Sequence, residues 1–502
     1  MKACNGFQSD HQAVVVVGRI KLNTVQRGLA AAVLTLCGMS LTLLTLGVGS
    51  SNVNAQPLRT GVNGVFESEP PNFQHVADAG ARFVLIPALW DSIAPAKRPN
   101  SWQPSDPADP NYNWSSVDSL VIGVVQAGLT PVLMTYGAPI WAQRCDVGHA
   151  TTVPSCNPDP TMFAAFATAA ARRYSGQFDG LPRVRYWQGF NEPNLSIFFT
   201  PQFEGRKAVS PTLYRALLNA FYFAVKSVNR SNLVLAAGLG PVAVPKYTIG
   251  PMRFARQLLC MTGRHHPHPT HGSCEGGVHF DIFDIHPYTT GGPKHSGGPD
   301  DVELGSLGRL QELLAAADRA GRIKGRFRHT PLWATEFAWD SKPPDPHGLA
   351  MKTETRWTAE AMFRFWSAGV SHVFWYQIRD PAGPPYQSGL YFRGPTPAED
   401  RPKELLYAFR FPFVSYSRKS GFFFWGRTPT STGGKITIQV LEAGKWRNAT
   451  VTRASASGIF EGVAEGSYGR HKQGTVRALY RGEGSVPFSL RPVKEFHQPP
   501  FG

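Results

Sequence analysis

Residues 185–194, which read RYWQGFNEPN, combine a strand-like beginning with an abrupt end. Tyr186 and Trp187 suit a pleated, buried surface. Pro193 cannot donate to a continuing strand ladder and restricts the residue before it, so the strand is expected to end there. The stretch therefore predicts that Glu192 stands at the C-terminal end of a strand, the edge at which parallel α/β barrels carry their active sites. The alternative is a turn whose glutamate faces solvent.

A second stretch, residues 331–339 (PLWATEFAW), is an apolar strand that ends around Glu336, with aromatic residues on both sides. A glutamate in such a run is a poor surface residue and is costly in a core unless it is paired. Glycosidic bond cleavage requires two carboxyl groups, one protonated to donate to the leaving oxygen and one ionised to attack the anomeric carbon. Glu192 and Glu336 are therefore predicted to belong to one catalytic site.

Strand-like and helix-like segments alternate from residue 61 onward, which is typical of a parallel sheet with crossover helices. Eight such strands fit. They predict an α/β fold, a (β/α)8 TIM barrel, with residues 56–411 as the catalytic domain. The expected strands are residues 61–66, 82–90, 130–136, a segment from Val184 that ends at Glu192, 233–238, 280–286, 332–336 and 370–377.

Residues 412–502 follow a different pattern. Residues 435–440 (KITIQV) alternate polar and apolar side chains, as in a half-buried antiparallel strand, and glycine-containing turns follow. A small C-terminal β-sandwich domain is expected. Its aromatic residues 422–425 could bind carbohydrate, but packing on the barrel is favoured because aromatic runs are usually core.

The tripeptides NEP (residues 191–193) and TEF (residues 335–337) at two strand ends resemble the clan A glycoside hydrolases. In that clan the acid/base follows strand four and the nucleophile ends strand seven. The phrase WQGFNEPNL (residues 187–195) looks most like family 39, the β-xylosidase and α-iduronidase family, with family 5 the next closest. The resemblance covers roughly residues 61–411 and implies that Glu192 is the acid/base and Glu336 the nucleophile.

The resemblance also implies residues that bind the substrate. Asn191, directly before the acid/base, would hydrogen-bond the sugar 2-hydroxyl, a bond that strengthens in the transition state. Tyr288, at the end of strand six, would hold the nucleophile, and His286 would be its neighbour or a structural histidine. One departure weakens the likeness to family 5: strand two has no arginine where many clan members place one beside the nucleophile.

Tryptophans at other strand ends are further candidates. Trp375 on strand eight matches the sugar platform of the clan, and Tyr376 is the competing choice if the register slips by one residue. Trp90 and Trp141, at or just after strands two and three, either line subsites or pack under loops.

The chain has 502 residues and a formal charge of +16. Residues 1–55 hold four basic residues and one acidic residue, so the charge without them is +13. This bias favours acidic surroundings, so an acidic glycan is among the candidate oligo- or polysaccharide substrates. Nucleic acid is not an expected partner, because no zinc-finger spacing and no aromatic RNA-binding signature is present. No cofactor and no metal is expected. The histidines at positions 265, 266, 268 and 271 are too irregularly spaced, and no carboxylate or thiolate set accompanies them.

Residues 1–55 resemble an export signal peptide. Basic residues precede an apolar run at residues 28–48, and small residues then predict cleavage after Ala55. The alternative is a retained membrane anchor, because the run is long for a signal core. Export to the exterior or the cell envelope fits the cysteines. The four that remain after cleavage form two near pairs, predicted to be disulfides: Cys145 with Cys156 and Cys260 with Cys274.

Together these features predict a secreted, retaining glycosidase that cleaves the O-glycosidic bonds of a β-linked glycan by double displacement. Two other functions fit the same sequence. One is a catalytically silent barrel that binds glycans at the envelope. The other is a transglycosylase that passes the glycosyl group to another sugar.

Overall fold

The computed structural model describes residues 56–64, 72–145, 152–244, 246–270, 274, 276–289, 291–384, 386–466 and 474–491. The predicted export signal at residues 1–55 lies outside this set. The chain divides into a unit of Met1–Asn54 and a unit of Ala55–Gly502, and the fold below is that of the second unit. None of the helices in the described residues has the length and hydropathy needed to cross a membrane.

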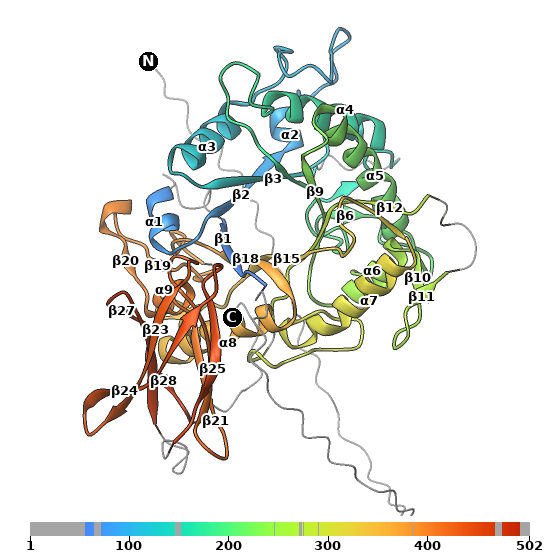
Figure 1. The fold of residues 1–502 in the computed structure, drawn as a ribbon. Coiled ribbons are helices and arrows are strands. Elements are labelled where there is room, and N and C mark those ends of the chain that lie inside the picture. The colour runs from blue at the N-terminus through green and yellow to red at the C-terminus, as the bar shows by residue number, and fades with distance from the viewer. Residues whose placement is uncertain are drawn as a thin grey trace, which may run out of the picture. The chain divides into compact units, whose positions relative to one another are not determined.

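Eight parallel strands close into a barrel in the order β1-β18-β15-β13-β9-β5-β3-β2 (Figure 1), which confirms the predicted fold. The third strand has the bounds expected from the sequence, and the others differ by one to a few residues. The barrel strands are β1 (Arg59–Asn63), β2 (Phe83–Leu89), β3 (Thr130–Tyr136), β5 (Tyr186–Gly189), β9 (Leu233–Leu239), β13 (Ile282–Ile285), β15 (Leu332–Phe337) and β18 (Val370–Tyr376).

Helices cover the outer face of the strands. Their starts follow the sequence: the side chain of Asp159 caps α4 by accepting from the backbone N–H groups of Thr161 and Met162, and Pro160 occupies the first helical position. The α-helices are α1 (Phe73–Asp78), α2 (Trp90–Ile93), α3 (Ser115–Gln126), α4 (Pro160–Arg173), α5 (Ser210–Val228), α6 (Pro251–Leu258), α7 (Leu307–Arg319), α8 (Met351–Ser367) and α9 (Glu404–Arg410). Short 3-10 helices lie at Ile140–Ala142, Leu304–Ser306 and Pro397–Glu399.

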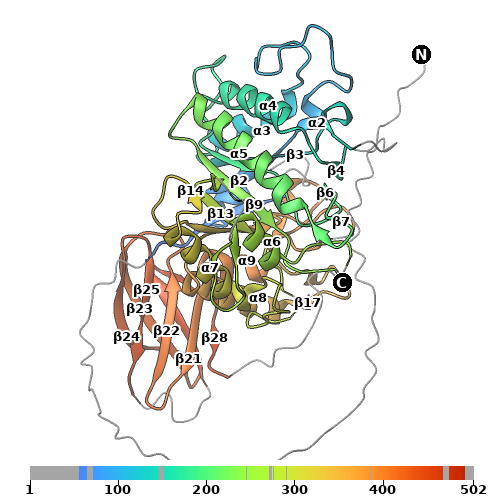
Figure 2. The same ribbon diagram turned by 90° about the vertical axis from the view of Figure 1, so that its right-hand side faces the viewer.

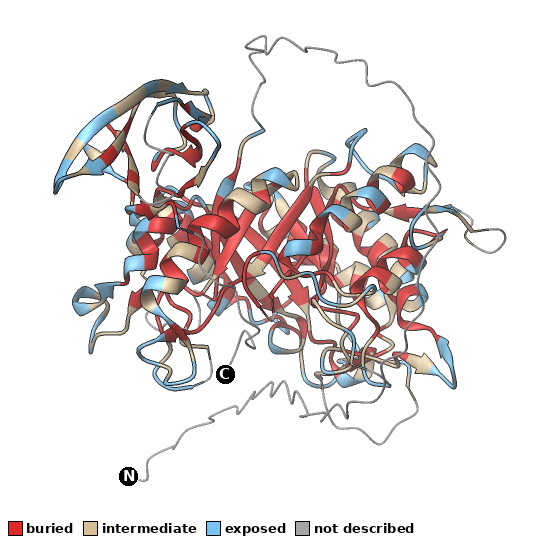
Figure 3. Cartoon of the chain, turned by 90° about the horizontal axis from the view of Figure 1, so that it is seen from below, coloured by how far each residue is buried: buried red, intermediate tan, exposed pale blue. Residues whose placement is uncertain are grey.

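The barrel strands are buried on both faces, as the red strands of Figure 3 show. Alternate residues face the barrel interior, where Trp333 of β15 and Phe374 of β18 belong to a small core cluster, and the residues between them pack outward against the helices. The interior cluster is filled by side chains in layers, as is usual for this barrel. Its members are Phe83, Leu85, Val132, Met134, Leu233, Leu235, Ile282, Trp333 and Phe374.

Short strand pairs brace the loops between the barrel strands and helices. Each strand of these pairs has only two residues, which is too short to show the alternation of apolar and polar residues that predicts a strand. They are β4 (Ser155–Cys156) with β6 (Phe199–Thr200), β7 (Phe203–Glu204) with β8 (Lys207–Ala208), β10 (Met261–Thr262) with β11 (His268–Pro269), β12 (Val278–His279) with β14 (Ile323–Lys324), β16 (Ser341–Lys342) with β17 (Leu349–Ala350), and β19 (Tyr391–Phe392) with β20 (Arg401–Pro402).

Disulfide bonds join Cys145 to Cys156 and Cys260 to Cys274, the two pairs predicted from the sequence. Each closes a short loop. The histidines at positions 265, 266 and 268 lie exposed within the second loop, whereas position 271 is outside the described residues.

The C-terminal region forms two antiparallel sheets (Figure 2), as expected for a β-rich accessory domain. Trp425 is fully buried and packs on Phe363 and Trp366 of α8, and Phe423 packs on Phe363, so these two residues of the aromatic run pack on the barrel, as favoured from the sequence. The boundary at residue 411 stays a prediction. One sheet holds β21 (Phe413–Ser417), β22 (Phe422–Arg427) and β25 (Ile459–Ala464); the other holds β23 (Gly434–Glu442), β24 (Lys445–Ala454), β26 (Thr475–Tyr480), β27 (Glu483–Gly484) and β28 (Phe488–Ser489).

Candidate active site

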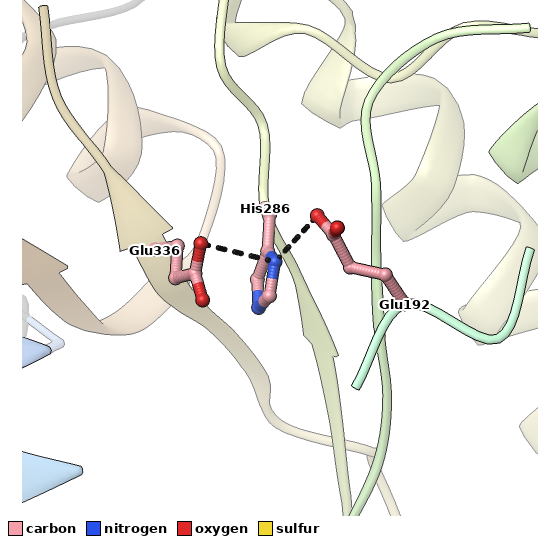
Figure 4. A group of neighbouring side chains, drawn as sticks. All are labelled: Glu192, His286 and Glu336. Carbon is pink, nitrogen blue, oxygen red and sulfur yellow. Dashed lines mark hydrogen bonds and ion pairs between the residues drawn. The ribbon is translucent and has the colours of Figure 1, made fainter. Parts of the chain in front are cut away.

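The two predicted catalytic glutamates meet at the C-terminal edge of the barrel. Glu192 follows β5, and its backbone N–H donates to the carbonyl of Gly238 at 3.1 Å. Glu336 is the penultimate residue of β15. Figure 4 shows His286, which follows β13, between the two carboxyl groups. One oxygen of each glutamate and one ring nitrogen of His286 all lie within 4.8 Å of one another.

Glu192 lies in an environment that keeps its proton. The residue is 8% exposed, and burial raises the pKa of its carboxyl from 4.5 to about 8. Its oxygen Oε1 lies 2.8 Å from His286 Nδ1. Because desolvation disfavours the charged form, Glu192 is protonated at neutral pH and can donate a proton.

Glu336 lies in an environment that favours its charge. Asn63 Nδ2 donates to Glu336 Oε1 at 2.9 Å, and the Tyr288 hydroxyl donates to Glu336 Oε2 at 3.1 Å. Burial and the charge of Glu336 raise the pKa of Tyr288 well above its ordinary value, so this hydroxyl stays a donor. Hydrogen bonds to a carboxylate stabilise its ionised form. The surroundings of the two glutamates thus differ in the direction that acid and nucleophile require.

Below the glutamates, the other side of the His286 ring contacts buried polar groups. Nε2 lies 3.1 Å from Thr335 Oγ1, which is hydrogen bonded in turn to Asp284 Oδ2 at 3.0 Å. Burial lowers the pKa of His286, so its ring is neutral. Burial raises the pKa of Asp284 to about 8, although hydrogen bonds from the backbone N–H groups of Gly238 and of Asp284 itself act in the opposite direction.

Glu192, His286 and Glu336 are close enough to hold a metal ion by distance alone. The facing atoms already have partners within the chain, since His286 Nδ1 contacts Glu192 and Tyr288 donates to Glu336. Among the described residues no further carboxylate, imidazole or thiolate joins the three. A carboxyl that keeps its proton beside one that is held ionised is suited to proton transfer and nucleophilic attack.

Asn191 lies beside Glu192 and is 5% exposed. Its Oδ1 is buried and has no hydrogen-bond partner among the described residues. A buried amide oxygen without a partner is costly. Asn191 is therefore able to accept a hydrogen bond from a hydroxyl that enters the site.

The strand-eight aromatic residue at the site is Tyr376, not Trp375. Trp375 has no exposed surface, donates its indole N–H to the Ser388 carbonyl at 2.7 Å and packs against Phe337 outside the barrel, so it offers no face to a sugar. Tyr376 shares the inward face of β18 with Phe374, is partly exposed and interacts electrostatically with Tyr288. Successive side chains along a strand point to opposite faces, so if Tyr376 faces the barrel interior, Trp375 must face outward.

Trp90 and Trp141 have different surroundings. Trp90 is fully buried against Phe163 and Phe166. Its position therefore fits the packing role and not that of a residue lining a subsite. Trp141 is half-buried and donates its indole N–H to the Pro95 carbonyl at 2.8 Å, which leaves part of its ring surface exposed.

Three polar residues of the site were not anticipated. Asn63 ends β1 and donates to Glu336, in a barrel whose second strand has no arginine near its C-terminal end. Thr335 and Asp284 face inward below the glutamates. All three share one sequence signal, a polar residue in or at the end of an otherwise apolar strand. Burying a polar group there costs free energy unless it is hydrogen bonded, so such a residue is a candidate for the site.

Solved structures of glycoside hydrolases resemble this chain. A family 39 glycoside hydrolase of the gut symbiont Bacteroides cellulosilyticus WH2 matches with a TM-score of 0.50 and 18% identity, over 82% of this chain and 80% of that chain. A glucosidase of Croceicoccus marinus matches with a TM-score of 0.46 and 12% identity, over 82% and 93%. A broad-specificity family 5 endoglucanase of Clostridium acetobutylicum has a TM-score of 0.39 and 14% identity, over 66% and 91%.

No family model matches the chain, and no curated protein does. At these identities the likeness concerns the fold. The chain is a (β/α)8 barrel similar to that of a family 39 glycoside hydrolase, in agreement with the resemblance carried by its two glutamate motifs.

Proposed function

We propose that this protein is an exported, retaining glycosidase that cleaves O-glycosidic bonds of a β-linked glycan by double displacement. The observation that carries the proposal is the separation of the two carboxyl groups, one oxygen of each lying within 4.8 Å of the other. Retaining enzymes place these groups about 5–5.5 Å apart, whereas inverting enzymes leave about 6.5–9.5 Å for a water molecule.

The roles follow from the surroundings of each carboxyl. Glu336, held by Asn63 and Tyr288, attacks the anomeric carbon while Glu192 donates its proton to the leaving oxygen. A covalent glycosyl–Glu336 ester results. Glu192, now ionised, takes a proton from water, and the hydroxide equivalent displaces Glu336 to release the sugar with net retention. Asn191 accepts from the sugar 2-hydroxyl.

The two disulfides support export, because such bonds persist in oxidising compartments. The charge of +13 without residues 1–55 supports a glycan in acidic surroundings.

The test is hydrolysis of a panel of aryl β-glycosides and polysaccharides, acidic ones included, followed by proton NMR of the first product. Retention gives the β-anomer first, with the α-anomer appearing only by slow mutarotation. An α-anomer as the first product would make Glu336 a general base and refute double displacement. Absence of any turnover that depends on Glu192 would refute the enzyme assignment.

A further inference from the structure

A row of three hydrogen bonds leads from the acid/base into the barrel interior. Glu192 Oε1 contacts His286 Nδ1 at 2.8 Å, His286 Nε2 contacts Thr335 Oγ1 at 3.1 Å, and Thr335 Oγ1 contacts Asp284 Oδ2 at 3.0 Å. Asp284 follows the interior core residue Ile282 by two positions on β13, and Thr335 follows Trp333 by two on β15, so both face inward.

The hydrogens in this row can point towards Asp284 or away from it, and the tautomer of His286 decides which. A neutral imidazole has one N–H and one lone pair, and a hydroxyl has one hydrogen to donate. His286 Nδ1 faces two carboxyl groups, Glu192 Oε1 at 2.8 Å and Glu336 Oε2 at 3.5 Å. A lone pair at Nδ1 would be repelled by the ionised nucleophile. The proton therefore belongs on Nδ1, and Nε2 must accept.

The remaining two bonds follow from that choice. Thr335 is the partner of Nε2, so its only hydrogen is directed there. It has none left for Asp284, and the bond between these two residues must be donated by the carboxyl. We propose that Asp284 is a protonated carboxylic acid in the active protein and that, through Thr335, it holds His286 in the tautomer that donates to Glu192.

The surroundings of Asp284 support the neutral form. The residue has no exposed surface, and its Oδ1 has no hydrogen-bond partner among the described residues. An ionised oxygen in that position would be far more costly than a neutral carbonyl oxygen. Burial raises the pKa of this carboxyl to about 8, in agreement with a His286 tautomer that carries its proton on Nδ1.

The inference rests on the proposed glycosidase function for its catalytic meaning. With Nδ1–H donating to Oε1, Glu192 keeps its proton on Oε2, free for the leaving oxygen. Once that proton has left, the new carboxylate already receives a hydrogen bond and nothing has to rearrange. Water returns the proton to Glu192 in the second step, while Asp284 neither gains nor loses one. Asp284 and Thr335 are thus positioning residues.

The first experiment does not depend on activity. Infrared spectra of the full chain at neutral pH are compared between wild type and Asp284→Asn, in the carbonyl region of protonated carboxylic acids. We expect a band in the wild type that Asp284→Asn lacks and that Glu192→Gln retains. Identical spectra of wild type and Asp284→Asn in this region would mean that Asp284 is ionised and would overturn the proposal.

The second experiment uses the rates. Asparagine offers an N–H in place of the carboxyl O–H, so Asp284→Asn should keep kcat/KM within about threefold. Asp284→Leu removes the O–H donor, and Thr335→Val removes the hydroxyl that connects Asp284 to His286. Each variant should lower kcat about tenfold or more, with a smaller change in KM, which is within the range of acid–base catalysis. Thr335→Ser should restore the rate. An Asp284→Asn variant as slow as Asp284→Leu would contradict the mechanism.

The pH profile adds a readout that a purely structural role would not move. In the wild type, ionisation of Asp284 would reverse the row of hydrogen bonds, so both Asp284 and Glu192 contribute to the alkaline loss of kcat/KM; in Asp284→Asn the loss should be shallower. The titratable groups near Asp284 are His286 just after β13, Glu336 on β15 and Tyr214 on α5. Burial holds the pKa of Tyr214 well above its ordinary value, so it does not contribute in this range.

Thr330→Val is the matched control. Thr330 also donates its hydroxyl to a carboxylate, Asp318 Oδ1 at 2.7 Å, but it lies before β15 and outside the row. Its rates and pH profile should equal those of the wild type. A wild type that is inactive on every glycoside but shows the Asp284 infrared band would refute the glycosidase function and leave the protonation of Asp284 established.

Discussion

The buried carboxyl of Glu192 should make the stability of this protein depend on pH in a defined direction. Its pKa is about 8 in the folded protein against a reference value of 4.5. Because this carboxyl has a higher pKa in the folded state, its effect on the free energy of unfolding is most favourable below pH 4.5. The free energy of unfolding then falls progressively as the pH rises from 4.5 towards 8. At about 1.4 kcal/mol per pH unit, the loss by neutral pH is about 3 kcal/mol.

Glu192→Gln tests this reasoning, because glutamine keeps the shape of the side chain and an oxygen for His286 but cannot ionise. The variant should match the wild type in free energy of unfolding near pH 4. Its advantage should grow to about 3 kcal/mol at neutral pH. Urea unfolding followed by circular dichroism at a series of pH values measures both proteins.

The control is Glu461→Gln, on an exposed position of β25, for which no such gain is expected. A difference between Glu192→Gln and wild type that stays constant with pH would refute the raised pKa of Glu192. It would also remove the argument that Glu192 enters the reaction protonated.

Three further outcomes follow from the site. Glu336→Ala should stop turnover, and azide should restore cleavage with an α-linked product, seen by NMR; a β-linked product would contradict the role of Glu336. Tyr288→Phe removes a donor to Glu336, and kcat should fall about tenfold, in line with the loss of a hydrogen bond to a charged group; an unchanged kcat would show that this hydrogen bond does not contribute to the rate. Glu192→Gln should lose about 10²–10⁴-fold in rate on poor leaving groups and much less on acidic ones; equal losses would exclude general acid catalysis by this residue.

The sequence predicted the barrel because its strands are short apolar runs separated by helix-length segments, a pattern that local preferences make visible. It predicted both glutamates because each interrupts an aromatic strand end. The choice between Trp375 and Tyr376 could not be made in advance, because both lie at the end of the same strand. Which of them faces inward depends on a register that neighbouring strands set.

Asn63 was missed for a related reason. An asparagine at the end of a first strand is compatible with an ordinary turn. Its role depends on β15, which pairs with β18, which in turn pairs with β1, so its contact with Glu336 spans 273 residues of sequence. No local pattern contains that information. The barrel and the two disulfides could be predicted because their signals, alternating segments and closely spaced cysteines, are local in the sequence.

The surroundings of Glu192 and Glu336 explain how one barrel edge can hold both a protonated and an ionised carboxyl. Ile282 on β13 and Trp333 on β15 belong to the apolar cluster inside the barrel. Asp284 and Thr335 follow them by two residues on the same strands, and Asp284 has no exposed surface, which favours its neutral form. His286 links Glu192 to Thr335 and Asp284, while Asn63 and Tyr288 donate hydrogen bonds to Glu336. The two carboxyl groups can therefore differ in charge across less than 5 Å, because burial keeps the proton on Glu192 whereas these donors stabilise the ionised form of Glu336.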